Sequence, residues 1–85
     1  MKSKVFSVFD SKVGSFATPW CSPTVASGKR AFGAAVQDQS SMLAKHGEDY
    51  SLFLVGEFDE LTGMLLPCAP ENLGLASSFV VLERE

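Results

Sequence analysis

The segment Tyr50–Met64 constrains the fold more than any other part of the chain. Its first six residues, Tyr50–Val55, are almost all apolar, aromatic or β-branched, which is typical of a strand covered on both faces. Acidic and turn-forming residues follow, and Gly63 permits the positive φ angle of a tight reversal. Apolar residues then resume until Pro67. The pattern predicts a β-hairpin with a polar, acidic tip.

The remaining periodicity predicts an α+β fold, a small two-layer domain in which helices lie on one face of a largely antiparallel sheet. Strands are expected near residues 4–9, 15–19, 50–58, 63–67 and 78–82, with one main helix over 23–37 and a short helix over 42–46. Pro19 places the second strand at an edge of the sheet, because proline cannot donate a ladder hydrogen bond. A single helical turn is expected at Pro70–Leu73.

The main helix is marked by its start and by two glycines. Ser22 is a favourable N-cap, and Pro23 fits the first turn, where a missing N–H costs nothing. Ser41 is the expected cap of the short helix. An apolar stripe at spacings of three and four is formed by Val25, Gly28, Phe32, Ala35 and Val36. Gly28 and Gly33 each weaken a helix by roughly 1 kcal/mol relative to alanine, so we expect both to permit the close approach of a neighbouring segment, most simply the sheet.

The 85 residues are expected to form a single domain over 1–85. A hydrophobic content of 46% exceeds what one small core needs, so we expect an apolar patch for a partner, most simply a second copy in a homodimer. Cys21 and Cys68 do not form a zinc motif, and free, partly buried thiols are preferred over a disulfide between them. The N-terminus lacks the apolar stretch of a signal peptide, and no apolar run is long enough for a membrane span.

Catalytic chemistry is not indicated. His46 would need a carboxylate such as Glu48 or Asp49 to act as a base, and a cation at the end of a short helix is the simpler interpretation. An acidic cluster at the hairpin tip consists of Glu57, Asp59 and Glu60. It could bind a divalent cation or serve acid–base chemistry, but a hydrated turn is the simpler reading. Without a nucleophile, phosphate-loop or dinucleotide motif, we expect no enzyme, no metal and no cofactor.

Charge is distributed unevenly along the chain. The first 30 residues carry +4 and the other 55 carry −7. Aromatic residues lie between the N-terminal bases, and aromatics with nearby cations suit single-stranded nucleic acid. Candidate nucleic-acid-binding residues are Lys4, Lys12, Lys29 and Arg30 for phosphates and Phe16 and Trp20 for base stacking. The alternative is that the aromatics belong to the core and the lysines keep an edge strand from aggregating.

Three segments resemble the small nonstructural protein of gokushovirus-type microviruses, which are bacteriophages with a circular single-stranded DNA genome. They are F-S-V-F-D-S-K at 6–12, Thr24 with Arg30-Ala31-Phe32, and E-D-Y-S-L-F-L-V-G-E-F-D-E-L-T-G at 48–63. The third is the most specific, because an apolar strand followed by G-x-F-D-x-x-T-G is uncommon. This chain has Gly47 where such proteins commonly have proline, and the resemblance covers about the first 66 residues.

The resemblance implies a nonstructural role in the bacterial host cytoplasm and no catalytic residue. Our first hypothesis is therefore a non-enzymatic accessory protein that binds single-stranded DNA or assists viral genome synthesis or packaging. The alternative is a protein-interaction module that binds a host or viral protein, such as a replication or packaging factor, through an apolar or acidic surface.

Overall fold

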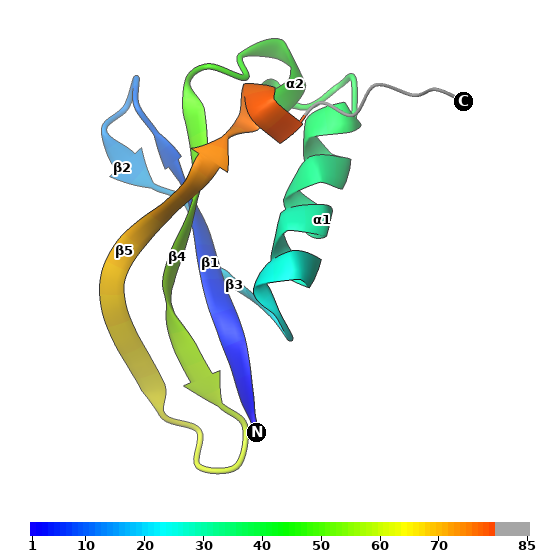
Figure 1. The fold of residues 1–85 in the computed structure, drawn as a ribbon. Helices are drawn as coiled ribbons and strands as arrows, with labels where there is room; N and C mark the ends of the chain where they lie inside the picture. The colour runs from blue at the N-terminus through cyan, green and yellow to red at the C-terminus, as the bar shows by residue number, and fades with distance from the viewer. Residues whose placement is uncertain (80–85) are drawn as a thin grey trace.

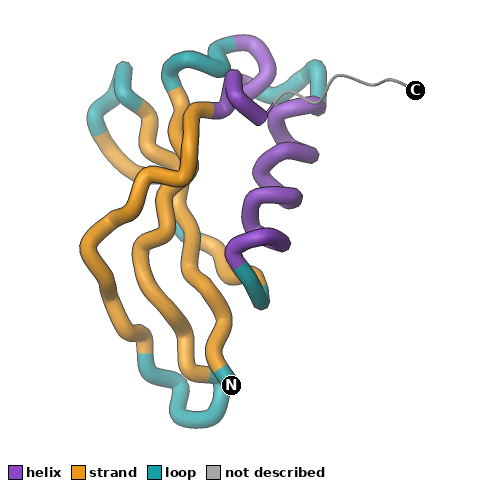
Figure 2. Tube along the Cα trace, in the orientation of Figure 1, coloured by secondary structure: helices purple, strands orange, loops and turns teal. Residues whose placement is uncertain are grey.

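The computed structural model describes residues 1–79 and has the predicted α+β architecture (Figure 1). A sheet of five strands carries the helices on one side, to the right of and above the strands in Figure 2. The strands are β1 (Lys2–Asp10), β2 (Ser15–Phe16), β3 (Trp20–Ser22), β4 (Tyr50–Asp59) and β5 (Leu65–Leu75). The helices are α1 (Val25–Gln37), α2 (Met42–Lys45) and a 3-10 helix, η1 (Ala76–Phe79). Every strand pairing among residues 1–79 is antiparallel, which confirms the predicted largely antiparallel sheet.

Strand β1 lies in the middle of the sheet. It pairs with β4 along its whole length, and β5 pairs with the other edge of β4. On its opposite side β1 pairs with β2 at one end and with β3 at the other, so these two strands act as one interrupted edge strand. The predicted strand 15–19 is therefore wrong beyond Phe16, and β3 was not predicted. Pro19 lies in the interruption, as expected of a residue that has no N–H for the ladder.

The predicted hairpin between β4 and β5 is confirmed. Its reversal is closed by the backbone N–H of Asp59, which donates to the Met64 carbonyl at 2.9 Å, and Gly63 has a φ of 79°. The second strand is far longer than the predicted 63–67, and the helical turn expected at Pro70–Leu73 is wrong because these residues belong to β5. An edge strand tolerates prolines because it pairs on one side only, and two register shifts let it bend.

The predicted strand at 78–82 is also wrong where the structure describes it. Ser78 and Phe79 end the 3-10 helix η1, while residues 80–82 lie outside the described part of the chain. The Phe79 ring packs edge-on against Phe32 of α1, with the ring centroids 5.0 Å apart. This contact draws the end of the described chain onto the helix side of the sheet.

Helix α1 begins two residues later than predicted. Its N-cap is Thr24, not Ser22, and the Thr24 hydroxyl accepts the Ser27 N–H at 3.0 Å while Ser27 Oγ accepts the Thr24 N–H. Ser22 is instead held in β3 opposite Lys4. The predicted cap of α2 is confirmed, since the Ser41 hydroxyl accepts the backbone N–H of Ala44.

The core lies between α1 and one face of the sheet. Its buried members are Phe6, Phe32, Val36, Leu52 and Ala76. The close approach predicted at Gly28 is confirmed, because a Cβ built there would lie 2.2 Å from the Phe6 ring. At Gly33 the neighbour is not the sheet but η1, and the contact is an ordinary one, because the atom nearest to such a Cβ is the Phe79 carbonyl oxygen at 3.9 Å. Gly33 is nevertheless buried, whereas Ala35, placed on the predicted stripe, is exposed.

Candidate interaction surface

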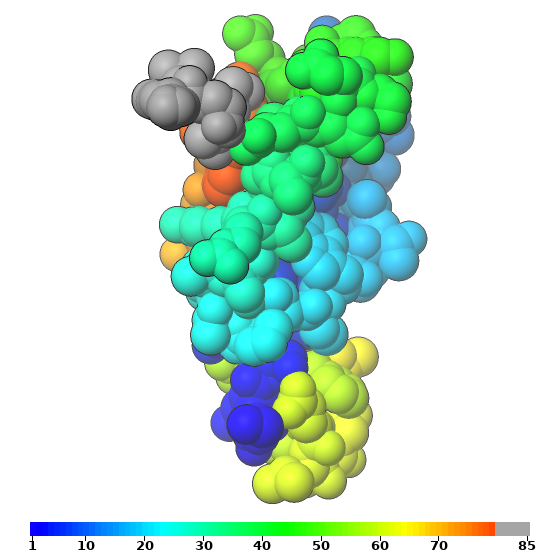
Figure 3. Space-filling model, turned by 90° about the vertical axis from the view of Figure 1, so that its right-hand side faces the viewer, coloured from blue at the N-terminus to red at the C-terminus, as the bar shows by residue number. Residues whose placement is uncertain are grey.

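Every charged residue of the five strands lies on the helix side of the sheet. Phe6 contacts Gly28 of α1, so the Phe6 side chain defines the helix side of the sheet. Side chains point to the same side when their residues are register partners, or when they are two apart in an unbroken strand. By this rule the charged residues on the helix side are Lys2, Lys4, Asp10, Glu57, Asp59 and Glu71. Figure 3 looks onto this side, where the first residues and the hairpin tip extend below α1. The ionic side chains therefore occupy the part of the helix side that α1 leaves in water.

The opposite side of the sheet, which we call the open face, carries no charged residue in its described strands. Its register positions are Ser3, Val5, Ser7, Phe9, Phe16, Cys21, Ser51, Phe53, Gly56, Phe58, Leu65, Pro67, Asn72 and Leu75. No helix among residues 1–79 covers it (Figure 1). An antiparallel sheet face that meets water is normally polar. This one is mostly apolar, and its central positions Ser3, Val5, Ser7 and Gly56 are already buried. Its exposed apolar residues, such as Phe16 and Leu65, therefore lie toward the edges of the sheet.

Phe9, Phe16 and Phe53 form an aromatic cluster at one end of the open face. The Phe16 ring centroid lies 4.9 Å from that of Phe9 and 5.2 Å from that of Phe53, with the rings tilted or edge-on. Phe16 is still 45% exposed, because it stands on the short edge strand β2. These contacts fix three large rings in a preferred aromatic geometry while leaving part of the cluster in solvent.

The other end of the open face is hollowed. A depression of about 380 Å³ lies here, mostly apolar but bordered by one acidic residue, and its lining consists of Val5, Pro19, Val55, Gly56, Glu57, Leu65, Leu66 and Pro67. Val55 is the residue left unpaired by the register shift between β1 and β4, and such a bulge locally bends its strand. Leu65 on its rim is 67% exposed. The open face therefore combines an aromatic projection with an apolar hollow.

The six predicted nucleic-acid-binding residues do not form one surface. Lys4 lies on the helix side, where its ammonium is 2.5 Å from the Glu57 carboxylate. Trp20 is on the same side and stacks on the buried Phe6 at 5.7 Å, while Phe16 belongs to the open face. The predicted alternative, a core role for the aromatics, thus describes Trp20 better than Phe16.

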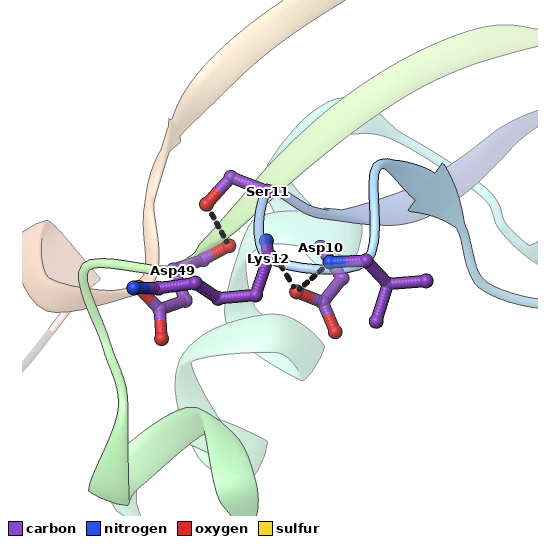
Figure 4. Close-up of polar contacts among 5 residues, drawn as sticks. Asp10, Ser11, Lys12 and Asp49 are labelled. Atoms are coloured by element: carbon purple, nitrogen blue, oxygen red, sulfur yellow. Dashed lines mark hydrogen bonds and ion pairs between the residues drawn. The ribbon is translucent and has the colours of Figure 1, made fainter.

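Lys12 lies in the turn between β1 and β2 (Figure 4). The Asp10 carboxylate accepts the Lys12 N–H at 2.9 Å, and the Ser11 hydroxyl donates to the Asp49 carbonyl at 3.1 Å. The Lys12 ammonium is 4.0 Å from the Asp49 carboxylate. Asp10 and Asp49 thus order this turn, and Lys12 projects from it.

Lys29 and Arg30 are the two predicted cations that the structure brings together. Both are exposed on α1 and line one hollow of about 700 Å³ with Gln37 and Phe79. Neither makes an ion pair with a residue in 1–79.

The acidic cluster at the hairpin is engaged with its neighbours. The Lys4 ammonium lowers the pKa of Glu57 by hydrogen bonding and by its charge. The backbone N–H of Leu61 donates to the Asp59 carboxylate and lowers the pKa of Asp59, and Ser3 donates to Glu60. Among residues 1–79, no group of three or more His, Cys, Asp or Glu side chains is placed to hold a metal ion.

The other candidates are exposed. His46 is the C-cap of α2 and borders a hollow with Glu48 and Asp49. Cys21 and Cys68 are free thiols, and both are exposed, so the expectation that they are partly buried is wrong.

The open face is not among the sites predicted from the sequence. The signal was nevertheless present in β1, where the charged residues stand at positions 2, 4 and 10 and the odd positions are all uncharged. Alternation of this kind separates the two sides of a strand. It did not show which of the two sides α1 covers.

Residues 1–79 thus form a small antiparallel α+β domain in which one sheet face has no charged residue at its register positions and no helix over it. The family model described as Phage ORF5 protein matches residues 3–79, so the chain belongs to this family of phage proteins. A search of curated proteins and a search of solved structures each found no match. No helix in the described part of the chain has both the length and the apolar character needed to cross a membrane.

Proposed function

We propose that this phage protein is a non-enzymatic accessory protein that acts by binding another protein through the open face. The observation that carries the proposal is the segregation of charge: all six ionic residues of the strands lie on the helix side. An apolar, aromatic patch without charge is typical of the centre of a protein interface. The bacterial host cytoplasm is the proposed location.

The open face is less suited to nucleic acid. Affinity for DNA depends on neutralising phosphates with Lys and Arg, and none lies at a register position of this face. Phe9, Phe16 and Phe53 also pack on one another, which leaves less ring surface for bases.

A pull-down from phage-infected host lysate, with and without nuclease, tests the proposal. We expect a captured protein that survives nuclease and is lost in Phe16→Glu, because a charge buried in an apolar interface is costly. Val13→Glu is the matched control, since Val13 is 72% exposed in the β1–β2 turn and off the open face. Equal capture by wild type and Phe16→Glu would contradict the proposal.

A second candidate function is the binding of single-stranded DNA during viral genome synthesis or packaging, as the narrower resemblance to gokushovirus-type microviruses implies. The observation that favours it is the pair Lys29 and Arg30, adjacent on the exposed side of α1. In this proposal Lys4 and Lys12 add phosphate contacts, and Phe16 and Trp20 stack on bases from opposite sides of the sheet.

Salt titration with labelled oligonucleotides tests this candidate. About three phosphate contacts on a single strand predict that log affinity falls with log salt at a slope near −2. Lys29→Glu with Arg30→Glu should abolish binding, whereas Lys45→Glu on α2 should reduce it less. No binding at low salt would eliminate DNA as a direct ligand.

A further inference from the structure

We propose that residues 80–85, which read V-V-L-E-R-E, dock on the outer side of α1 and cover Lys29 and Arg30. The docking site is the hollow that these two cations line together with Phe79, the last residue that the structure describes. This inference goes beyond both proposed functions, because it needs neither a protein at the open face nor bound DNA. It assigns an occupant to the outer side of α1.

The hollow combines positive charge with small apolar residues. Its volume is about 700 Å³, and it lies on the side of α1 that faces the viewer in Figure 3. Lys29 and Arg30 are exposed there, and α1 contains no acidic residue that could balance them. Ala26, Arg30 and Gly33 follow one another at spacings of four and three, so the hollow runs along the helix axis.

The described chain ends at this hollow. The Phe79 carbonyl oxygen lies 3.9 Å from a Cβ built at Gly33. Arg30 and Lys29 are three and four residues before Gly33, which is roughly 5–6 Å along a helix. Four further residues span up to roughly 13 Å when extended, so Glu83 can reach either cation from the position of Phe79.

The composition of residues 80–85 matches the hollow. Three apolar residues come first, and the acids Glu83 and Glu85 follow on either side of Arg84. In an extended segment Val81, Glu83 and Glu85 share one side, whereas Arg84 points to the other. That side offers an apolar side chain to the small residues of α1 and one carboxylate to each of the two cations.

Such a contact makes access to the cations conditional. A polyanion would have to displace two carboxylates before it could bind Lys29 and Arg30, and it would be repelled by the carboxylates themselves. Exposed ion pairs are weak one by one and are screened by salt, so the contact is readily exchanged for a stronger anionic ligand. Residues 80–85 therefore act as an autoinhibitory segment for the basic surface of α1.

Disulfide trapping tests the contact. In a Cys21→Ser, Cys68→Ser background, the pair Ala26→Cys and Val81→Cys should close an intramolecular disulfide on mild oxidation. The control pair is Lys45→Cys and Val81→Cys, because Lys45 is exposed on α2 and lines a different hollow beside η1. The first pair should close about tenfold faster than the control. Equal rates, or a disulfide-linked dimer in place of the closed monomer, overturn the inference.

Charge reversal tests the role of the ion pairs. Lys29→Glu with Arg30→Glu should slow closure of the first pair about tenfold, and adding Glu83→Lys with Glu85→Lys should restore it. Both α1 residues are exposed, and far-ultraviolet circular dichroism verifies that each variant is folded. A closure rate that neither change alters overturns the inference.

Binding of a labelled oligonucleotide at low salt tests the autoinhibition. Glu83→Gln with Glu85→Gln should raise the affinity several-fold above that of Glu48→Gln with Glu71→Gln, which removes the same charge elsewhere. Equal affinities of these two variants overturn the autoinhibition. If no variant binds the oligonucleotide, the DNA candidate fails, and the trapping rates alone decide whether residues 80–85 dock on α1.

Discussion

The contact between α1 and the sheet predicts a large effect of Gly28→Ala. A Cβ at this position would lie 2.2, 2.5 and 2.6 Å from three carbons of the Phe6 ring, whereas ordinary contact begins near 3.4 Å. The ring cannot turn away freely, because Phe6 is fully buried and stacks on Trp20. The helix would have to move outward by roughly 1 Å, and its other core contacts would weaken.

The magnitude follows from two opposing terms. Overpacking a core costs typically 1–3 kcal/mol, and three contacts this short place the cost at about 3 kcal/mol. Replacing glycine by alanine within a helix returns about 1 kcal/mol. The expected net loss in the free energy of unfolding is therefore about 2 kcal/mol. For a domain of this size that lowers the thermal midpoint by roughly 8–16 °C.

Gly33→Ala is the matched control in the same helix. A Cβ there meets nothing closer than 3.9 Å, so only the helix-propensity term acts and the variant should gain about 1 kcal/mol. Urea denaturation monitored by circular dichroism measures both changes. With a denaturant slope of about 1 kcal/mol per molar, the midpoints should differ by about 3 M. All variants should be compared at one protein concentration, because self-association would raise the apparent stability.

A second substitution identifies the cause of the loss. Phe6→Leu removes the ring that would clash with the new methyl group of Gly28→Ala. The loss in free energy of unfolding of the double variant should therefore be smaller than the sum of the two single losses, by about 1–2 kcal/mol. If Gly28→Ala is as stable as Gly33→Ala, or if Phe6→Leu gives no relief, the packing of α1 described above is wrong.

Three further predictions concern local interactions. Glu57→Gln should have a lower free energy of unfolding than wild type near neutral pH, because Lys4 lowers the pKa of Glu57 in the folded state. The stabilisation by ionised Glu57 is fully present above the pKa of the unfolded state. The difference in free energy of unfolding between the two proteins should therefore disappear as the pH falls through the folded-state pKa. Thr24→Ala should cost about 1 kcal/mol in thermal unfolding by removing the N-cap, whereas Thr18→Ala, in the exposed segment between β2 and β3, should cost nothing measurable. Gly63→Ala should cost about 1–2 kcal/mol in urea denaturation, since its φ of 79° strains any residue with a Cβ.

The local sequence pattern was sufficient to predict the strands and the helix that are regular over many residues. The alternation in β1, the apolar run of β4 and the turn at Gly63 each match the observed structure. The same holds for most of α1, whose periodicity extends over three turns. In these segments the chain's own preference agrees with its tertiary environment, so short-range reasoning succeeds.

Long-range pairing decided the elements that were predicted wrongly. Pro67 and Pro70 argue locally against a strand, yet β5 passes through both because β4 supplies a partner along one edge. Ser22 is a good N-cap in isolation, but β3 pairs it with Lys4 and the helix begins after Thr24. In each case hydrogen bonds to a distant segment outweighed a local preference of about 1 kcal/mol.

The candidate surface shows the same division. Phe16 and Trp20 are four residues apart, and in one continuous strand they would share a side. The break at Ala17–Pro19 divides that strand in two, and the register places the two rings on opposite sides of the sheet. A binding surface that used both rings on one face was therefore not available to this fold.

The sequence by itself determined that each long strand has a charged side and an uncharged side, because side chains alternate along any extended chain. Only the tertiary structure decided which side is covered. Gly28 lets α1 pack closely on Phe6, so the helix occupies part of the charged side and leaves the uncharged side open. A single helix can cover only one face of a sheet, so in the described part of the chain the face opposite α1 has no helix over it.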